Sequence, residues 1–120
     1  MKVLIVESGA EIAEVWRRHL SRAGHDVRVA HSADAGVARL TAEPFGIVIL
    51  NVLVDGESAL SIADYARFRN PDSRVIFVSE SSFFSDGSIF GLVPNARAMV
   101  PAHTPPEDLT ALVEHYGQAS

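Results

Sequence analysis

The sequence predicts a three-layer α/β domain built on a parallel sheet, and three observations point to this fold class. Short runs of β-branched and aliphatic residues recur along the chain, as in strands that are buried on both faces. Segments with the apolar periodicity of amphipathic helices alternate with these runs. The 120 residues are 48% hydrophobic and 21% charged, which suits a single domain with its own core. We therefore expect one domain over residues 1–120, in the order βαβαβαβαβα with right-handed crossovers.

Five strands are expected. The continuous apolar runs at 3–6, 46–50 and 75–78 predict central strands. Val27–Val29 alternates in polarity and Ala98–Val100 is short, so both predict weaker strands nearer the edges of the sheet.

The first helix is predicted by an apolar stripe, followed by Gly24 as a stop signal. The stripe comprises Ile12, Val15, Trp16, His19 and Leu20. Ser8 and Glu11 have the spacing of a capping box at its start.

Three further helices are predicted from the same kinds of signal, a cap and an apolar stripe. Residues 33–42 form the second, with Ser32 as the cap and with Val37 and Leu40 facing inward. Residues 58–69 form the third. Its inward positions are Ala59, Ile62, Ala63 and Ala66.

The last helix follows a capping box at Thr104 and Glu107. Its stripe comprises Leu109, Leu112, Val113 and Tyr116. Between these helices, residues 81–94 contain two glycines and a proline, so any helix there is short or frayed.

Composition excludes several classes of function. The chain has no cysteine, which removes disulfides, thiolate metal sites and cysteine nucleophiles. Its net charge is −5 and its bases form no run, so direct nucleic-acid binding is not expected. No apolar stretch is long enough to cross a membrane, and there is no signal-peptide pattern, so we expect a cytoplasmic domain. Of the ten basic residues only Lys2 is a lysine. Met1 directly precedes the first strand, as in a stand-alone protein or an N-terminal domain.

In open parallel sheets the ligand crevice lies beyond the carboxyl ends of the strands. The residues that follow these ends are Glu7 and Ser8, the segment 51–57, Ser79 and Glu80, and the segment 101–103.

Five segments, in this order and spacing, resemble the receiver domain of bacterial two-component response regulators over essentially the whole chain. They are residues 2–7, 23–27, 45–51, 75–79 and 106–109. The resemblance implies a five-stranded, doubly wound sheet of order 2-1-3-4-5. It also implies phosphoryl transfer to an aspartate after the third strand, with Mg²⁺ held by that aspartate and by acids after the first strand. A lysine after the fifth strand and a Ser or Thr after the fourth contact the phosphoryl group in this family, and an aromatic residue on the fifth strand responds.

Most of these functional positions are changed here. The phosphoacceptor position falls on Asn51, whose neutral amide is not a nucleophile, and the acidic pair falls on Glu7 and Ser8. The lysine position falls near Pro101, and only Ser79 matches the family. The responsive aromatic falls near Ala98 or Met99, and the segment 54–56 replaces the usual proline-containing turn. With one carboxylate left, we expect Mg²⁺ binding to be weak or absent. The chain is thus predicted to be a degenerate pseudo-receiver, without a cofactor and without enzymatic activity.

Each candidate residue also has an ordinary structural explanation. Ser8 fits a helix cap, Asn51 is a common loop former, and Asp55 in an Asp-Gly pair fits a turn. Asp55 is nevertheless a candidate for a displaced phosphoacceptor, although a site without a lysine disfavours this role.

A regulatory module acts through its surfaces. The resemblance implies docking on the first helix or on the surface formed by the fourth helix, fifth strand and fifth helix, where the family often dimerises. The candidate surface residues are Trp16, Arg17, Phe83, Phe84, Phe90, Met99 and Leu112. The implied partner is a histidine kinase, a phosphotransfer protein or a regulator. The alternative hypothesis is a sensor of a small ligand, either a nucleotide or another anion. The ligand would bind in the vacated crevice or on an arginine-bearing face that uses Arg97 or the arginines of the first helix. Against it, there is no glycine-rich phosphate loop.

Overall fold

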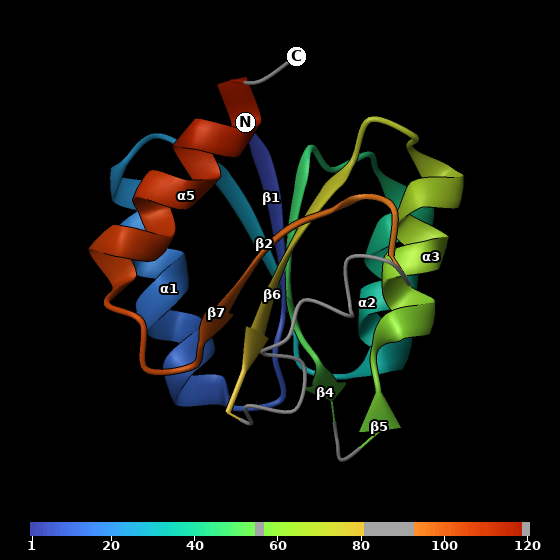
Figure 1. Cartoon of the computed structure of the whole chain (residues 1–120), viewed down its shortest axis with the longest axis horizontal. Helices are drawn as coiled ribbons and strands as arrows, with labels where there is room; N and C mark the ends of the chain where they lie inside the picture. The colour runs from blue at the N-terminus through green and yellow to red at the C-terminus, as the bar shows by residue number, and fades with distance from the viewer. Residues whose placement is uncertain (55–56, 81–92, 119–120) are drawn as a thin grey trace.

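The computed structural model describes residues 1–54, 57–80 and 93–118. Five parallel strands form one sheet in the order β2-β1-β3-β6-β7, which confirms the predicted fold class and strand order (Figure 1). These strands are β1 (Lys2–Val6), β2 (Asp26–Ala30), β3 (Ile47–Asn51), β6 (Arg74–Ser79) and β7 (Ala96–Pro101). The weakly signalled strands β2 and β7 lie at the two edges, as expected from the alternating polarity of the first and the short apolar run of the second.

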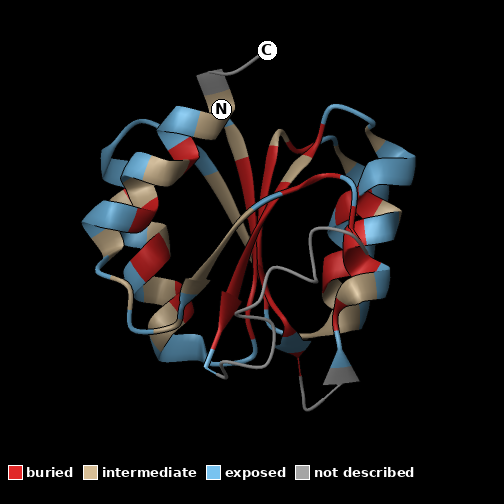
Figure 2. Ribbon diagram, in the orientation of Figure 1, coloured by how far each residue is buried: buried red, intermediate tan, exposed pale blue. Residues whose placement is uncertain are grey.

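Helices cover both faces of the sheet. They are α1 (Ala10–Arg22), α2 (Ala33–Ala42), α3 (Leu60–Arg69) and α5 (Pro106–Gln118). Alternate residues of the central strands point to opposite faces, so Leu4 and Val48 pack toward α2 and α3, whereas Ile5 and Ile49 pack toward α1 and α5. This double burial, shown in Figure 2, explains why Val3–Val6 and Ile47–Leu50 are apolar at every position.

The helix boundaries agree with the sequence in part. The α2 helix has the predicted bounds, and its Ser32 cap accepts a hydrogen bond from Ala35 N at 3.1 Å. The α3 helix begins two residues later than expected, because Ser58 pairs with Leu53 in a short hairpin. Two residues expected to face inward are exposed instead: Val15 by 43% and Val37 by 37%.

The hairpin was not predicted. It pairs β4 (Leu53–Val54) with β5 (Glu57–Ser58) in antiparallel register, directly after β3. Ala59 N donates to Val52 O at 2.9 Å, which joins the base of the hairpin to the start of α3. The hairpin therefore extends from the carboxyl edge of the sheet, where the candidate site lies (Figure 1).

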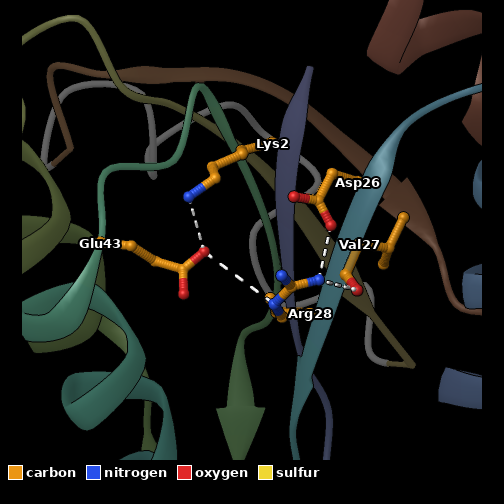
Figure 3. Close-up of polar contacts among 5 residues, drawn as sticks. All are labelled: Lys2, Asp26, Val27, Arg28 and Glu43. Atoms are coloured by element: carbon orange, nitrogen blue, oxygen red, sulfur yellow. Dashed lines mark hydrogen bonds and ion pairs between the residues drawn. The ribbon is translucent and has the colours of Figure 1, made fainter.

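A charged cluster ties the amino ends of β1 and β2 to the end of α2 (Figure 3). Lys2 Nζ lies 3.0 Å from Glu43 Oε1, and Arg28 Nη1 lies 2.5 Å from Asp26 Oδ1. Arg28 Nε lies 4.0 Å from the same Glu43 oxygen. The only lysine of the chain is thus ion-paired at the edge of the sheet opposite the candidate site.

Candidate functional site

The carboxyl edge of the sheet brings together four predicted site residues. Glu7 directly follows β1, and Asn51, Ser79 and Pro101 end β3, β6 and β7. Ser79 pairs with Pro101 in the sheet, and Ala102 N donates to Ser79 O at 2.9 Å. The topology therefore gathers residues from four strands at one edge, as expected for this class of sheet.

Glu7 and Asn51 form the centre of the site. Asn51 Nδ2 donates to Glu7 Oε1 at 2.7 Å, and Gly9 N donates to Glu7 Oε2 at 2.9 Å. Glu7 is 4% exposed and Asn51 is 7% exposed. Because both carboxylate oxygens accept a hydrogen bond, burial of this charged group is partly compensated.

The orientation of the Asn51 amide is fixed by a second bond. Leu53 N donates to Asn51 Oδ1 at 3.0 Å, an Asx-turn geometry that requires the oxygen on that side. The Nδ2 group must then face Glu7. Asn51 thereby cross-links the end of β1 to the start of the β4–β5 hairpin.

A cavity of about 510 Å³ opens at this edge of the sheet. Its lining combines two carboxylates, two hydroxyls, the Asn51 amide and two apolar side chains. The lining residues are Glu7, Ser8, Gly9, Ile12, Asn51, Leu53, Ser79 and Glu80. Neither arginine, lysine nor histidine is among them. The described part of this cavity is therefore electronegative.

Ser8 does not cap α1. The N-cap residue is Gly9, and no side chain makes a capping bond there. The Glu7 carboxylate takes the Gly9 N–H instead, and Ser8 is exposed at the mouth of the cavity. The predicted capping box with Glu11 is therefore wrong. Thr104 also differs from its predicted role, because its hydroxyl donates to Pro101 O at 2.7 Å.

The residues present do not match a magnesium site. Mg²⁺ prefers several carboxylate and water oxygens in octahedral geometry. Here Glu7 is the single buried carboxylate, and its Oε1 faces the N–H protons of Asn51 rather than a second oxygen. Across the described ranges, no three His, Cys, Asp or Glu side chains form a set that could hold a metal ion.

Apart from Arg17, the predicted surface residues divide into three groups. Trp16 is only 3% exposed and packs in the core between α1 and the sheet, so its interpretation as a core residue is favoured over that as an exposed contact. Met99 and Leu112 are half-buried against the two core clusters. Asp55, with Phe83, Phe84 and Phe90, lies outside the described residues.

Arg17 is half-exposed and bonded to its own helix. Its Nε donates to Glu14 Oε2 at 2.8 Å and its Nη2 to Glu14 Oε1 at 2.5 Å. The hydrogen bond from Arg17, supported by its positive charge and by Arg18, lowers the pKa of Glu14 from 4.5 to about 2. Because the folded pKa is depressed, this pair stabilises the fold above pH 4.5, and its contribution disappears as the pH falls through about 2.

We expect an NMR titration of the Glu14 carboxyl carbon to give a midpoint near 2 in the wild-type chain. In Arg17→Gln the midpoint should move toward the ordinary value of a glutamate, because the charged donor is lost. An unchanged midpoint in that variant would show that Arg17 does not hold this carboxylate.

Comparison with solved structures identifies the fold. The receiver domain protein of Methanospirillum hungatei JF-1, described as CheY-like, superimposes with a TM-score of 0.86 at 22% identity. The match covers 97% of this chain and 92% of that one. The chain has the receiver-domain fold. A response regulator of Burkholderia pseudomallei, solved with a phosphorylated aspartic acid, a calcium ion and citrate, matches with a TM-score of 0.80 at 19% identity. That match covers 98% of this chain and 72% of the other.

Sequence comparison agrees with this fold. The DNA-binding transcriptional regulator NtrC of Rhizobium meliloti (strain 1021) is 28% identical over 117 residues, which cover 98% of this chain. The chain spans about a quarter of the length of that regulator, 23%. No protein-family model matches the chain.

Two features of this receiver fold were missed in the sequence. The Gly9 and Leu53 backbone amides fix the Glu7–Asn51 pair, and Leu53, 52% exposed, forms a hydrophobic rim of the cavity. The tendency of asparagine to accept a bond from the amide two residues later was the signal for the Leu53 contact. No local signal predicts the bond between Glu7 and Asn51, because 44 residues separate them.

Proposed function

We propose that this receiver-fold chain is a signalling module that is not phosphorylated and acts through protein–protein contacts. The Asn51 amide carries this proposal. It lies where the resemblance puts the acceptor carboxylate, and its Nδ2 is bonded to Glu7 at 2.7 Å. An amide is not a nucleophile toward a phosphoryl group, and its N–H protons repel Mg²⁺. The chain is then neither an enzyme nor a phosphate carrier.

The absence of a lysine after β7 also supports the proposal that the chain is not phosphorylated. Pro101 ends β7 at the position implied for the phosphate-binding lysine, and its carbonyl accepts bonds from both the N–H and the hydroxyl of Thr104. Lys2 is paired with Glu43 at the opposite edge. None of Glu7, Asn51, Ser79 and Pro101 at the ends of β1, β3, β6 and β7 is basic. These residues therefore cannot neutralise a phosphoryl group, which is the main electrostatic requirement of phosphoryl transfer.

A groove of about 390 Å³ beside α1 supports a docking function. It lies between α1 and the segment that joins β7 to α5, and its lining is mostly apolar. The lining includes Ile12, Val15, His103, Pro105 and Pro106. We propose that a kinase, a phosphotransfer protein or another regulator docks here, where the half-buried Ile12 and exposed Val15 offer apolar contact.

Two other proposals are less well supported. Dimerisation through the fourth helix, β7 and α5 involves residues 81–92, which lie outside the described residues. An anion or nucleotide bound in the crevice needs positive charge there, whereas the described lining has Glu7 and Glu80 and no base. Within the described residues, no helix combines the length and hydropathy that a membrane crossing requires.

The test is incubation with acetyl phosphate and Mg²⁺, followed by intact mass spectrometry. We expect no phosphorylated species in the wild-type chain. Stoichiometric incorporation of one phosphoryl group would disprove the proposal, and its loss in Asp55→Asn would then identify Asp55 as the acceptor. A conventional receiver domain treated in parallel shows that the reagent is active.

A further inference from the structure

The Glu7 carboxyl group lies in a nearly solvent-free position, with both of its oxygens bonded. The Leu53–Asn51 bond holds the Asn51 Nδ2 group toward Glu7, and Gly9 N donates to the other carboxylate oxygen. Both Glu7 oxygens therefore accept a hydrogen bond. A charged group that is 4% exposed requires compensation.

Among the described residues, the Glu7 carboxylate is bonded only to neutral donors. Its donors are one side-chain amide and one backbone N–H at the start of α1, and the helix terminus contributes only partial positive charge. The described lining of the cavity contains no basic side chain and adds a second carboxylate, Glu80. The segments 55–56 and 81–92, which follow Val54 and Glu80 in the sequence, contain no Lys, Arg or His.

We infer that this cavity receives a Lys or Arg side chain from a partner protein, with the cation placed against Glu7 and Glu80. The inference rests on the proposed function, because it assigns chemistry to the same unphosphorylated site. Charge complementarity favours a monovalent side-chain cation over an anion, and the amide protons of Asn51 disfavour a metal ion that must strip its water shell.

The rim of the cavity fits the stem of such a side chain. Leu53 is 52% exposed at the hairpin and Ile12 is half-buried on α1, and both line the cavity. Lys and Arg bury their methylene groups on apolar surfaces while the charged end remains near polar groups. A free metal ion or inorganic cation gains nothing from these apolar contacts.

The experiment uses blocked tripeptides, acetyl-Gly-Xaa-Gly-amide, titrated into ¹⁵N-labelled chain. Xaa is Lys, Arg, norleucine or Glu, so that norleucine matches the lysine stem without its charge. Mg²⁺ is titrated separately. We expect the Gly9 amide and the Asn51 side-chain amide to shift with the Lys and Arg peptides, with saturation at millimolar concentration, and not with the other two.

Two variants test the carboxylates. Glu80→Gln should weaken binding of the Lys peptide about two- to threefold, because it removes an exposed charge and leaves the Glu7 bonds intact. Glu7→Gln should weaken binding of the Lys peptide about tenfold. This variant also places an NH₂ group opposite the Asn51 or Gly9 donor, so it is compared with Glu80→Gln. Asp64→Asn, a change of an exposed carboxylate on α3, is the matched control and should have no effect.

The outcomes separate the inference from the proposed function. Equal shifts with norleucine and lysine, or shifts that persist unchanged in Glu80→Gln and Glu7→Gln, overturn the inference. If the peptides have no effect and Mg²⁺ has none, the inference fails while the unphosphorylated site remains supported. If Mg²⁺ shifts both amides at millimolar concentration and the Lys peptide does not, the inference and the proposed function both fail.

Discussion

Trp16→Ala is expected to destabilise the chain by about 3–5 kcal/mol, the usual cost of removing a large buried aromatic side chain. Trp16 is 3% exposed and packs with Leu20, Ile5 and Leu109, at the junction of α1, the sheet and α5. Alanine leaves a cavity that surrounding strands cannot fill. Since small domains have only about 5–15 kcal/mol of stability, urea unfolding followed by circular dichroism should show a large decrease in midpoint.

The adjacent Arg17 provides the control. Arg17→Ala removes a partly exposed side chain whose main partner is Glu14 on the same helix, so the unfolding midpoint should change little. If Trp16→Ala instead unfolded at the wild-type midpoint and lost only partner binding, Trp16 would be an interface residue rather than part of the core.

Asn51→Asp is expected to destabilise the chain at pH 7 by about 2–3 kcal/mol in the absence of divalent cations. The substitution replaces the Nδ2 donor by an oxygen, so two buried carboxylates face one another across the 2.7 Å contact with Glu7. Such a pair retains a proton at unusually high pH, which means that a folded-state pKa is raised. Its penalty should therefore be small near pH 4 and grow as the pH rises to 7.

Millimolar Mg²⁺ should restore most of the lost stability of Asn51→Asp, because the cation can bridge the two carboxylates. It should leave the wild-type chain unchanged in the same thermal unfolding experiment. Comparable stabilisation of both chains by Mg²⁺ would contradict the proposed role of the amide.

Asn70→Asp is a close control for this change. Asn70 also accepts a bond from the amide two residues later, Asp72 N, but its Nδ2 donates to the Phe45 carbonyl rather than to a carboxylate. The variant loses a comparable hydrogen bond without creating a pair of carboxylates. It should therefore show a smaller rise in penalty toward neutral pH, because its new carboxylate faces a neutral carbonyl, and no response to Mg²⁺.

Local and periodic signals were sufficient for the fold class and its main strands, whereas the strand order came from the family resemblance. The apolar runs identified the central strands because parallel strands between two helical layers are buried on both faces. The Ser32 signal gave the start of α2, because a cap depends only on residues within one turn. The sequence also identified Asn51 as a neutral residue at the critical strand end, since residue type requires no coordinates.

The tertiary structure decided which apolar helix residues are exposed, how α1 is capped and how Glu7 bonds to Asn51. These features depend on contacts between distant segments. Val15 and Val37 continue the apolar stripes of α1 and α2, yet they are exposed, since each helix covers only a narrow strip of the sheet. The Ser8 cap was displaced by the neighbouring Glu7 carboxylate, whose position is fixed by the end of β1 and by Asn51. The bond between Glu7 and Asn51 itself exists only because β1 and β3 are adjacent and in register, with Val6 paired to Leu50.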